Sequence, residues 1–350
     1  MNRGRPPGVS LRWWWVSGAI IVLFGAIVAG AMVGPISIPP GDIVGSMLAR
    51  LPFSRFESGL SERTEAILWE IRFPRVILAV LVGSMLSAAG AGYQGAFRNP
   101  LADPYLLGAG AGAGLGATIA IAYGPATSGW VVDPLVLAAF LGALLGVGMA
   151  YALGYSVRSG RTALTLILAG VAVASFLTAI QTYVQQRESD TLREVYGWIL
   201  GSLNTAGWGE VRLVLPYVAV CLAGIFAARR LLDILAVGDT EAGTLGVAPS
   251  RIRLGIVVLA TLGTAAVVSV SGLIGFVGII VPHFVRMLTS VSYRVVVPLS
   301  ILVGGAFLVL ADIVARVAIN PSEIPIGVVT AMIGAPFFAL VLRRSKGVSS

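Results

Sequence analysis

Cysteine, histidine and lysine are almost absent from this 350-residue sequence, and each scarcity excludes a class of site. Because Cys221 is the only cysteine, the chain can form neither an intrachain disulfide nor a Cys-x-x-Cys site. A single histidine, His283, excludes a histidine-rich metal site or a bis-histidine haem site within one chain. The only lysine, Lys346, lies near the C-terminus and outside any GxxxxGKS or GxxxxGKT pattern, so the chain has no Walker A loop.

Charged residues are also scarce, because they make up 11% of the chain while hydrophobic residues make up 57%. Water-soluble domains carry about a quarter charged residues. The composition therefore predicts an all-α polytopic membrane protein that forms one membrane domain over residues 1–350. The net charge of +8 does not indicate nucleic-acid binding, since the arginines lie at the ends of apolar segments, where membrane lipid is the expected partner.

Apolar segments that suit a bilayer crossing, which takes about 20 residues per helix, recur about ten times. The first follows Arg12 and resembles a signal peptide, but its length favours a retained membrane helix over a cleaved leader. The eighth is short and is interrupted by Pro282, which makes it the weakest of the set. The predicted segments are 13–34, 71–96, 105–123, 131–155, 164–184, 211–228, 252–270, 274–288, 295–317 and 324–342.

An even number of spans places both termini on the same side of the membrane. Short loops on that side hold most of the basic residues, among them Arg98, Arg229 and Arg251. Because cytoplasmic loops carry such an excess, both termini are predicted to face the cytoplasm. The segment 35–70 is then external, with IPPGD suited to a turn and a helix start, and 187–211 is expected to hold an external surface helix.

A short polar segment, VGDTEAGTLGVAPSRIRL, separates two long apolar runs. Asp239 suits a helix N-cap, Glu241 places a negative charge in the first turn, and Gly246 can end the helix. Pro249 can then begin a second short helix. We expect two short helices over about 238–250, at the cytoplasmic surface, where a partner protein can act on them.

Three arginines lie at the predicted outer ends of membrane helices. Taken singly, Arg72, Arg75 and Arg316 are expected to reach lipid head groups. Taken together, they can face outward around a mouth and dock an acidic partner. Asp312 is the one carboxylate inside an apolar run, but an ion pair with Arg316, four residues on, is favoured over a proton relay.

The run GAGAGAGLGA contains a G-x-G-x-x-A pattern, yet a nucleotide fingerprint needs a preceding strand and a later acidic residue, and neither is present. Gly108, Gly112 and Gly116 are four residues apart, which instead predicts close helix packing. In the preceding turn, RNPLADP, two prolines and Asn99 indicate a rigid structure. A constriction formed by Asn99 and Leu101 requires such turns to meet at a symmetry axis.

Motifs along nearly all of the chain beyond residue 70 form a specific set. They include RFPR at 72–75, GYQGAFRNPLADPYLLG at 92–108, WILGSL at 198–203, VGDTEAGTLGV at 237–247, SGLIGFVGIIVPHFVRML at 271–288, LADIVAR at 310–316 and EIPIGVVTAMIGAPFFALVLRR at 323–344. Together they resemble the FecCD-type permeases, the membrane subunits of type II ABC importers for iron–siderophore complexes, haem and vitamin B12. The resemblance implies the type II importer fold with ten membrane helices per subunit.

The resemblance also implies partners and site residues. It implies a second permease subunit, as a homodimer, in a bacterial or archaeal plasma membrane, two cytoplasmic ATPase subunits that bind ATP and Mg²⁺, and an external substrate-binding protein. It implies no cofactor, metal site or catalytic residue on this chain. The residues implied in ATPase coupling are Gly238, Asp239, Glu241, Ala242, Leu245 and Gly246. Those implied in binding-protein docking are Arg72, Arg75 and Arg316, and those implied in a cytoplasmic gate are Asn99 and Leu101.

Two alternatives compete with a pump subunit driven by ATP on another chain. An ion-coupled secondary transporter normally needs ionisable groups near the membrane midplane, and the only candidate, Asp312, lies near a helix end. An intramembrane enzyme would have to use His283 without any convergent partner. The sequence leaves open whether the cargo is a ferric siderophore, haem or cobalamin, and whether the second permease is an identical copy.

Overall fold

The computed structural model describes residues 11–50, 58–125, 132–156, 163–319 and 322–346. Residues 51–57, part of the predicted external segment, lie outside these ranges. Within them the regular structure is helical, apart from one isolated bridge between Ile319 and Ser322. The helices are α1 (Trp13–Met32), α2 (Pro40–Ala49), α3 (Glu62–Ala66), α4 (Phe73–Phe97), α5 (Ala109–Tyr123), α6 (Pro134–Ser156), α7 (Ala163–Arg187), α8 (Leu192–Ile199), α9 (Trp208–Val237), α10 (Asp239–Thr244), α11 (Pro249–Ser271), α12 (Val277–Leu288), α13 (Tyr293–Val317) and α14 (Ile326–Lys346).

All ten predicted membrane segments coincide with helices. In the described part of the chain, seven helices are long and apolar enough to cross a membrane. Three shorter apolar helices, α5, α12 and the apolar part of α14, account for the other predicted segments. The short helix α8 falls in the predicted surface segment 187–211, and α2 begins within IPPGD at Pro40.

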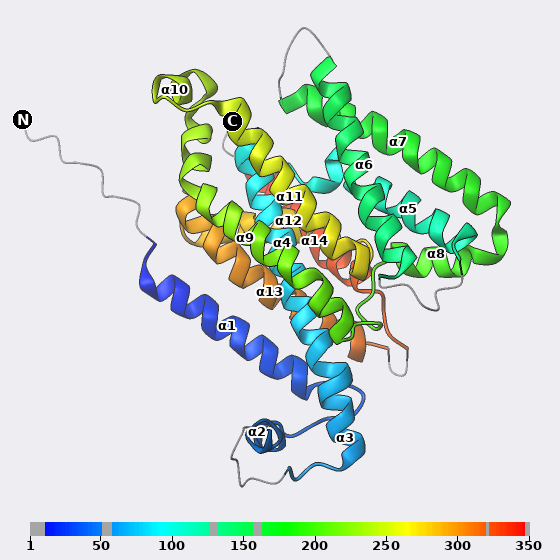
Figure 1. Cartoon of the computed structure of the whole chain (residues 1–350). Helices are drawn as coiled ribbons and strands as arrows, with labels where there is room; N and C mark the ends of the chain where they lie inside the picture. The colour runs from blue at the N-terminus through cyan, green and yellow to red at the C-terminus, as the bar shows by residue number, and fades with distance from the viewer. Residues whose placement is uncertain (1–10, 51–57, 126–131, 157–162, 320–321, 347–350) are drawn as a thin grey trace, which may run out of the picture.

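Helix α4 is the central element of the bundle. Figure 1 shows it surrounded by α9, α11, α12 and α13, and most of its residues from Pro74 to Phe97 are buried. Its small residues allow this position, because a Cβ atom at Gly90 would overlap the backbone of Gly278 in α12. The side chains that face α4 therefore form one continuous apolar core.

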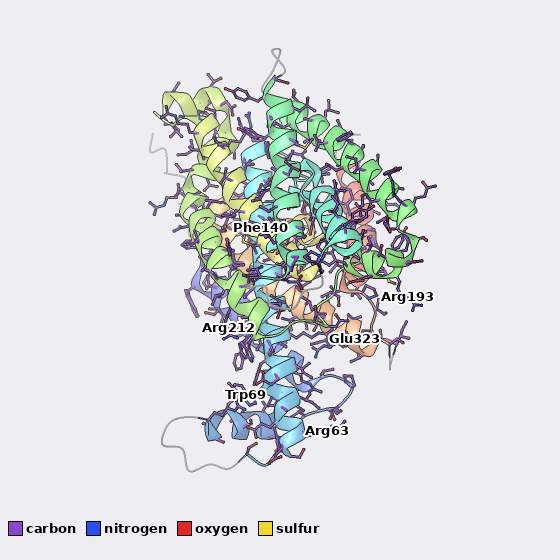
Figure 2. The ribbon with its side chains drawn as sticks, turned by 45° about the vertical axis from the view of Figure 1, so that its right-hand side comes forward. Arg63, Trp69, Phe140, Arg193, Arg212 and Glu323 are labelled. Carbon is purple, nitrogen blue, oxygen red and sulfur yellow. The ribbon has the colours of Figure 1, made fainter. Side chains whose placement is uncertain are left out.

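The second membrane helix is longer than predicted. Helix α3, a π-helical segment (η1, Ile67–Arg72) and α4 form one uninterrupted helix over Glu62–Phe97. It begins at Ser61, whose hydroxyl accepts a hydrogen bond from the amide of Thr64 at 3.3 Å. Figure 2 shows Trp69 on the part of this helix that projects beyond the bundle. We call this the α3 end of the molecule, and the opposite end, which carries α10, the α10 end (Figure 1).

The glycine pattern in α5 produces the predicted close packing. A Cβ atom at Gly112 would overlap the carbonyl oxygen of Gly142 in α6, and one at Gly116 would overlap that of Ala138. Gly146 of α6 approaches Gly108 in the same way. Helices α5 and α6 therefore pack backbone to backbone, which fixes the position of the turn that precedes α5.

The predicted interruption of the eighth span is wrong. Helix α12 runs through Pro282, although it is only 12 residues long. Its start is set by Phe276, whose φ of 69° is left-handed and places residues 274–276 outside the helix. Pro282 lies in the second turn and leaves only the carbonyl of Gly278, four residues earlier, without its helical partner, and that carbonyl accepts a hydrogen bond from the Gln94 side chain at 3.0 Å.

Candidate functional site

The polar segment after α9 forms a compact helical turn at the α10 end. Gly238 has a φ of 152°, which joins α9 to α10 and favours glycine. Gly246 ends the turn with a left-handed φ of 75°, as predicted, and the amide of Val247 donates to the carbonyl of Ala242 at 3.1 Å. The segment is therefore a defined protrusion rather than an open loop.

Two details of this segment were predicted wrongly. Asp239 is not the N-cap, because Gly238 holds that position and the Asp239 carboxylate forms ion pairs instead. Pro249 does not begin a separate short helix, since α11 continues without a break from Pro249 to Ser271. Proline at the first helical position starts a helix but does nothing to end it, and no proline follows within this helix.

Asp239 connects α10 to the end of α4. Its carboxylate accepts hydrogen bonds from Arg98 at 3.0 Å and from Arg253 at 3.0 and 3.2 Å. Arg253 also donates through Nε to the carbonyl of Ala96 at 2.8 Å. These hydrogen bonds link α10 to the last turn of α4 and to Arg98, the residue that begins the RNPLADP turn.

The surface of α10 combines an anchored face and an exposed face. Ala242 is completely buried, whereas Leu245 is 64% exposed. Glu241 is exposed, and its carboxylate folds back over Gly238, leaving no room for a side chain there. A partner protein can therefore contact Leu245 and Glu241 while Ala242 holds the helix against the bundle.

The turn after α4 is held by backbone and side-chain hydrogen bonds. Arg98 takes a left-handed φ of 50°, which ends α4. The Asn99 side chain accepts from the amide of Leu101 at 2.9 Å, and the Asn99 carbonyl accepts from the amide of Ala102 at 3.0 Å. Asn99 therefore stabilises the turn, and Leu101 is 39% exposed. Their role in a gate stays a prediction.

An ionic cluster joins α4 and α13 at the α3 end. The guanidinium of Arg75 contacts Asp312 at 2.9 Å and Glu323 at 2.8 Å. Asp312 also forms the predicted ion pair with Arg316, at 3.0 Å. Asp312 is 1% exposed, and together with Glu323 it supplies two carboxylates for the two arginines. Figure 2 shows Glu323 near the end of the bundle from which the α3 extension projects.

The expectation that the three arginines face outward is wrong. Arg72, Arg75 and Arg316 are 4%, 7% and 4% exposed. Arg72 donates to the carbonyls of Ala31 and Met32 at 2.8 and 3.0 Å, and Arg316 donates to that of Gly30 at 3.1 Å, so both bind the C-terminal end of α1. A helix C-terminus attracts cations, which explains why these side chains turn inward. Their role in docking a binding protein stays a prediction.

His283 shows no metal-binding environment in the described ranges. Its ring meets the edge of Phe337 with centroids 5.9 Å apart. No group of three histidine, cysteine, aspartate or glutamate residues that could hold a metal occurs in the part of the chain that the structure describes.

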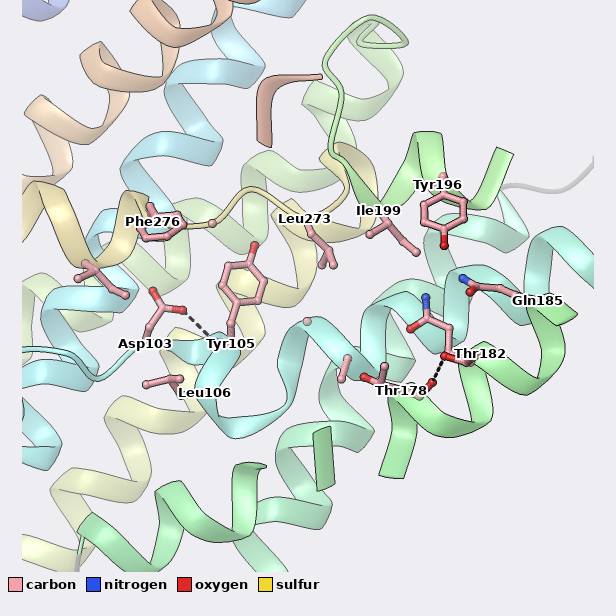
Figure 3. Close-up of a pocket in the computed structure, with 15 residues that line it drawn as sticks. Asp103, Tyr105, Leu106, Thr178, Thr182, Gln185, Tyr196, Ile199, Leu273 and Phe276 are labelled. Atoms are coloured by element: carbon pink, nitrogen blue, oxygen red, sulfur yellow. Dashed lines mark hydrogen bonds between the residues drawn. The ribbon is translucent and has the colours of Figure 1, made fainter. Parts of the chain in front are cut away.

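A cavity of about 620 Å³ lies between the RNPLADP turn, α7 and α8, and its residues were not predicted from the sequence (Figure 3). Asp103, from the turn, lines it together with Gln181 and Gln185 of α7. Asp103 accepts a hydrogen bond from the amide of Tyr105 at 2.9 Å, and burial raises the pKa of its carboxyl to about 6. Two glutamines four residues apart in an apolar helix are the signal that could have indicated this cavity.

The chain is similar along most of its length to permeases of known import systems. The chain is 40% identical over 286 residues to the cobalamin import system permease protein BtuC of Halobacterium salinarum, covering 81% of this chain and 75% of that one. It is 36% identical over 338 residues to the iron(3+)-hydroxamate import system permease protein FhuB of Bacillus subtilis, covering 95% and 86%.

A solved structure agrees with these sequence relatives. The fold matches a metal-chelate type ABC transporter in an inward-facing conformation with a TM-score of 0.81 and 26% identity, over 94% of this chain and 98% of that one. Residues 20–344 match the FecCD transport family. The chain is therefore a multi-pass membrane permease that belongs to the FecCD transport family.

Proposed function

We propose that this permease imports a metal chelate or a corrinoid into the cytoplasm by alternating access, powered by ATP hydrolysis on separate subunits. The named relatives that import cobalamin and iron(3+)-hydroxamate support this cargo class. No covalent chemistry occurs on this chain. ATP and Mg²⁺ bind to the ATPases, and the permease converts their movement into opening and closing of a path.

The observation that carries this proposal is the ion pair between Asp239 and Arg98. Asp239 lies in the first turn of α10, and Arg98 directly precedes Asn99 in the turn after α4. An ATPase that contacts Glu241 and Leu245 would move α10, and the ion pair would carry that movement to Asn99 and Leu101. These last two residues form the cytoplasmic gate in this proposal.

Membership of the FecCD family suggests the partners of this permease. Two ATPase subunits bind the α10 helices of two permease subunits, of which the second is another copy of this chain. The α10 end and both termini face the cytoplasm. An external substrate-binding protein delivers cargo at the α3 end. It has to bind the two permease conformations with different affinities, because a ligand shifts an equilibrium only through such a difference.

For docking, Arg72, Arg75 and Arg316 require a rearrangement in this proposal. A carboxylate of the binding protein would have to replace the internal acceptors that now hold them. The Glu323 side chain is 33% exposed, more than the other members of the cluster. A carboxylate of the binding protein would therefore most easily reach the buried arginines by replacing Glu323 beside Arg75.

A double-mutant cycle tests the coupling role of the ion pair. The variants are Arg98→Ala, Asp239→Ala and the double variant. Arg229→Ala is the control, because Arg229 donates to the carbonyl of Phe226 in its own helix. The measurement is cargo taken up per ATP hydrolysed by the permease, ATPases and binding protein in vesicles.

We expect each single variant to lower this ratio several-fold, and the double variant to be no worse than the poorer single one. The Arg229→Ala control should keep the wild-type ratio. Losses that simply multiply, or no loss at all, would show that the two residues do not act as a unit and would contradict the coupling role.

A further inference from the structure

Polar side chains from three separate segments meet at the cavity. Figure 3 shows Asp103 and Tyr105 of the turn on one side, and Thr178, Gln185 and Tyr196 of α7 and α8 on the other. The rest of the lining is largely apolar. Because the rest of the lining is apolar, each polar group there needs a hydrogen-bond partner, which can be a neighbouring side chain, water or a ligand.

Three of the lining side chains are largely buried, and each has a polar atom without a protein hydrogen-bond partner among the described residues. Asp103 is 4% exposed, Gln181 is 8% exposed and Gln185 is 9% exposed. In the described part of the chain, the amide groups of the two glutamines make no hydrogen bond. The Asp103 carboxylate accepts one bond through Oδ1, and its Oδ2 lies beside Gly278 at the start of α12.

Two of the other polar lining groups are already engaged. The Tyr105 hydroxyl lies 3.3 Å from both the amide and the carbonyl of Ile274, and the Thr182 hydroxyl donates to the carbonyl of Thr178 at 2.9 Å. The lining residues include no arginine, lysine, histidine or cysteine. Within the described ranges, the free capacity of the cavity is therefore a carboxylate, which accepts hydrogen bonds, and two amides and the hydroxyls of Thr178 and Tyr196, which donate and accept them.

We propose that this cavity binds part of the cargo, and that the cargo is a chelate whose rim carries amide or hydroxyl groups rather than carboxylates. The inference rests on the proposed importer function. Amide and hydroxyl groups can donate to Asp103 and exchange hydrogen bonds with Gln181 and Gln185. A carboxylate at the same place would be repelled by Asp103 with no nearby cation to balance it.

The cavity is also connected to the coupling helix. Asp103 and Arg98 belong to the same turn, and Arg98 is held by Asp239 of α10. Cargo bound at Asp103 and an ATPase that moves α10 would therefore act on the same turn. Because coupling between two binding equilibria is reciprocal, cargo that binds Asp103 should alter the nucleotide affinity of the complex.

Uptake by the complete transporter tests the inference. Vesicles that contain the permease, its ATPases and its binding protein are given one of three probes. The first is cyanocobalamin, whose rim carries carboxamides, and the second is ferrichrome, which is a peptide hydroxamate. The third is haem, which carries two propionates. We expect ATP-dependent uptake of cyanocobalamin or ferrichrome and none of haem. Haem uptake alone would overturn the inference and leave the importer function intact, whereas no uptake of any probe would contradict both.

Variants assign the effect to the cavity. Gln181→Leu combined with Gln185→Leu should lower cargo uptake by about tenfold, because buried hydrogen bonds to the cargo are lost. Gln186→Leu is the matched control, since Gln186 is exposed on the same helix and does not line the cavity. ATPase activity stimulated by the binding protein should stay within about twofold, which shows that the complex assembles.

A second measurement does not depend on the folding of the double variant. A photoreactive phenylalanine analogue at position 196, where Tyr196 is 55% exposed and lines the cavity, should crosslink the imported probe. Asp103→Asn, which keeps the side-chain shape, should reduce that crosslinking. Unchanged uptake in the glutamine variant, or an absence of crosslinking during active uptake, would overturn the inference.

Discussion

Arg75 and Asp312 are 237 residues apart in the sequence, yet Nε of Arg75 donates to Oδ1 of Asp312 at 3.0 Å inside the bundle. Asp312 is also paired with Arg316, so a single carboxylate holds two buried arginines. The contact fixes the first turn of α4 against the last turns of α13. The cluster is therefore a structural junction, whatever further role its arginines have in docking.

Removal of Asp312 should be strongly destabilising. Asp312→Ala leaves Arg75 and Arg316 with fewer acceptors, and breaking a buried ion pair costs about 3–5 kcal/mol. Glu323→Gln should cost less, because the Glu323 side chain is 33% exposed. The free energy of unfolding, measured with denaturing detergent in mixed micelles, checks both, with Asp190→Asn at an exposed position as the control. Equal losses of stability from the two substitutions would contradict the role of Asp312 as the central carboxylate of the cluster.

The docking role of the same arginines makes a different prediction. Arg75→Met should lower the free energy of unfolding at any salt concentration, because the lost contacts are internal and poorly screened. If Arg75 also docks the binding protein, the affinity between the two proteins should fall as well, and most at low salt. Binding measured at low and high salt separates the two roles. A large loss of affinity with unchanged stability would contradict the structural role.

The two faces of α10 should respond differently to substitution. Leu245→Arg alters a side chain that is 64% exposed, so it should weaken ATPase binding by about tenfold or more while the permease folds normally. Ala242→Leu overfills a completely buried position, so it should destabilise the permease itself. Co-purification of the ATPase and detergent unfolding of the permease distinguish the outcomes. Normal ATPase binding by Leu245→Arg would contradict the proposed contact.

Close packing between α5 and α6 should make Gly112 intolerant of any side chain. Gly112→Val would force its Cβ into the carbonyl of Gly142, and overpacking of this kind costs about 1–3 kcal/mol or more. Gly148→Val in α6 is the matched control, because nothing lies within 4 Å of a Cβ atom there. The fraction of folded protein after detergent extraction measures both. Equal yields of the two variants would contradict the packing.

The fold was predictable because its main determinants are local. Apolar runs locate the membrane helices, and glycines spaced four apart, such as Gly112 and Gly116, locate a tight helix contact. The boundary errors have local causes as well. The helix that contains Arg72 begins ten residues earlier, at Glu62, because no proline or glycine interrupts the sequence between them. Pro282 fails to break α12 because the carbonyl that it leaves free, that of Gly278, accepts a hydrogen bond from the side chain of Gln94 in another helix.

The site was less predictable because its contacts join distant segments. The left-handed Gly246 after α10 follows from the sequence, but one partner of Asp239 is Arg98, 141 residues away. The burial of Arg72 could not be inferred from the sequence, because its acceptors are backbone carbonyls at the end of α1. Every helix C-terminus offers such carbonyls, so the sequence does not indicate which one Arg72 binds. Only the folded chain brings Asp103 and Gln181 to one cavity.

The most direct test of the central claim compares vesicles that hold the permease alone with vesicles that also hold its ATPases and binding protein. Both receive the same cargo, the same ion gradients and internal or external ATP. The account predicts that only the complete complex concentrates the cargo, and only when ATP is present on the side of α10. Accumulation by the permease alone, driven by an ion gradient, would contradict it and would favour an ion-coupled secondary transporter.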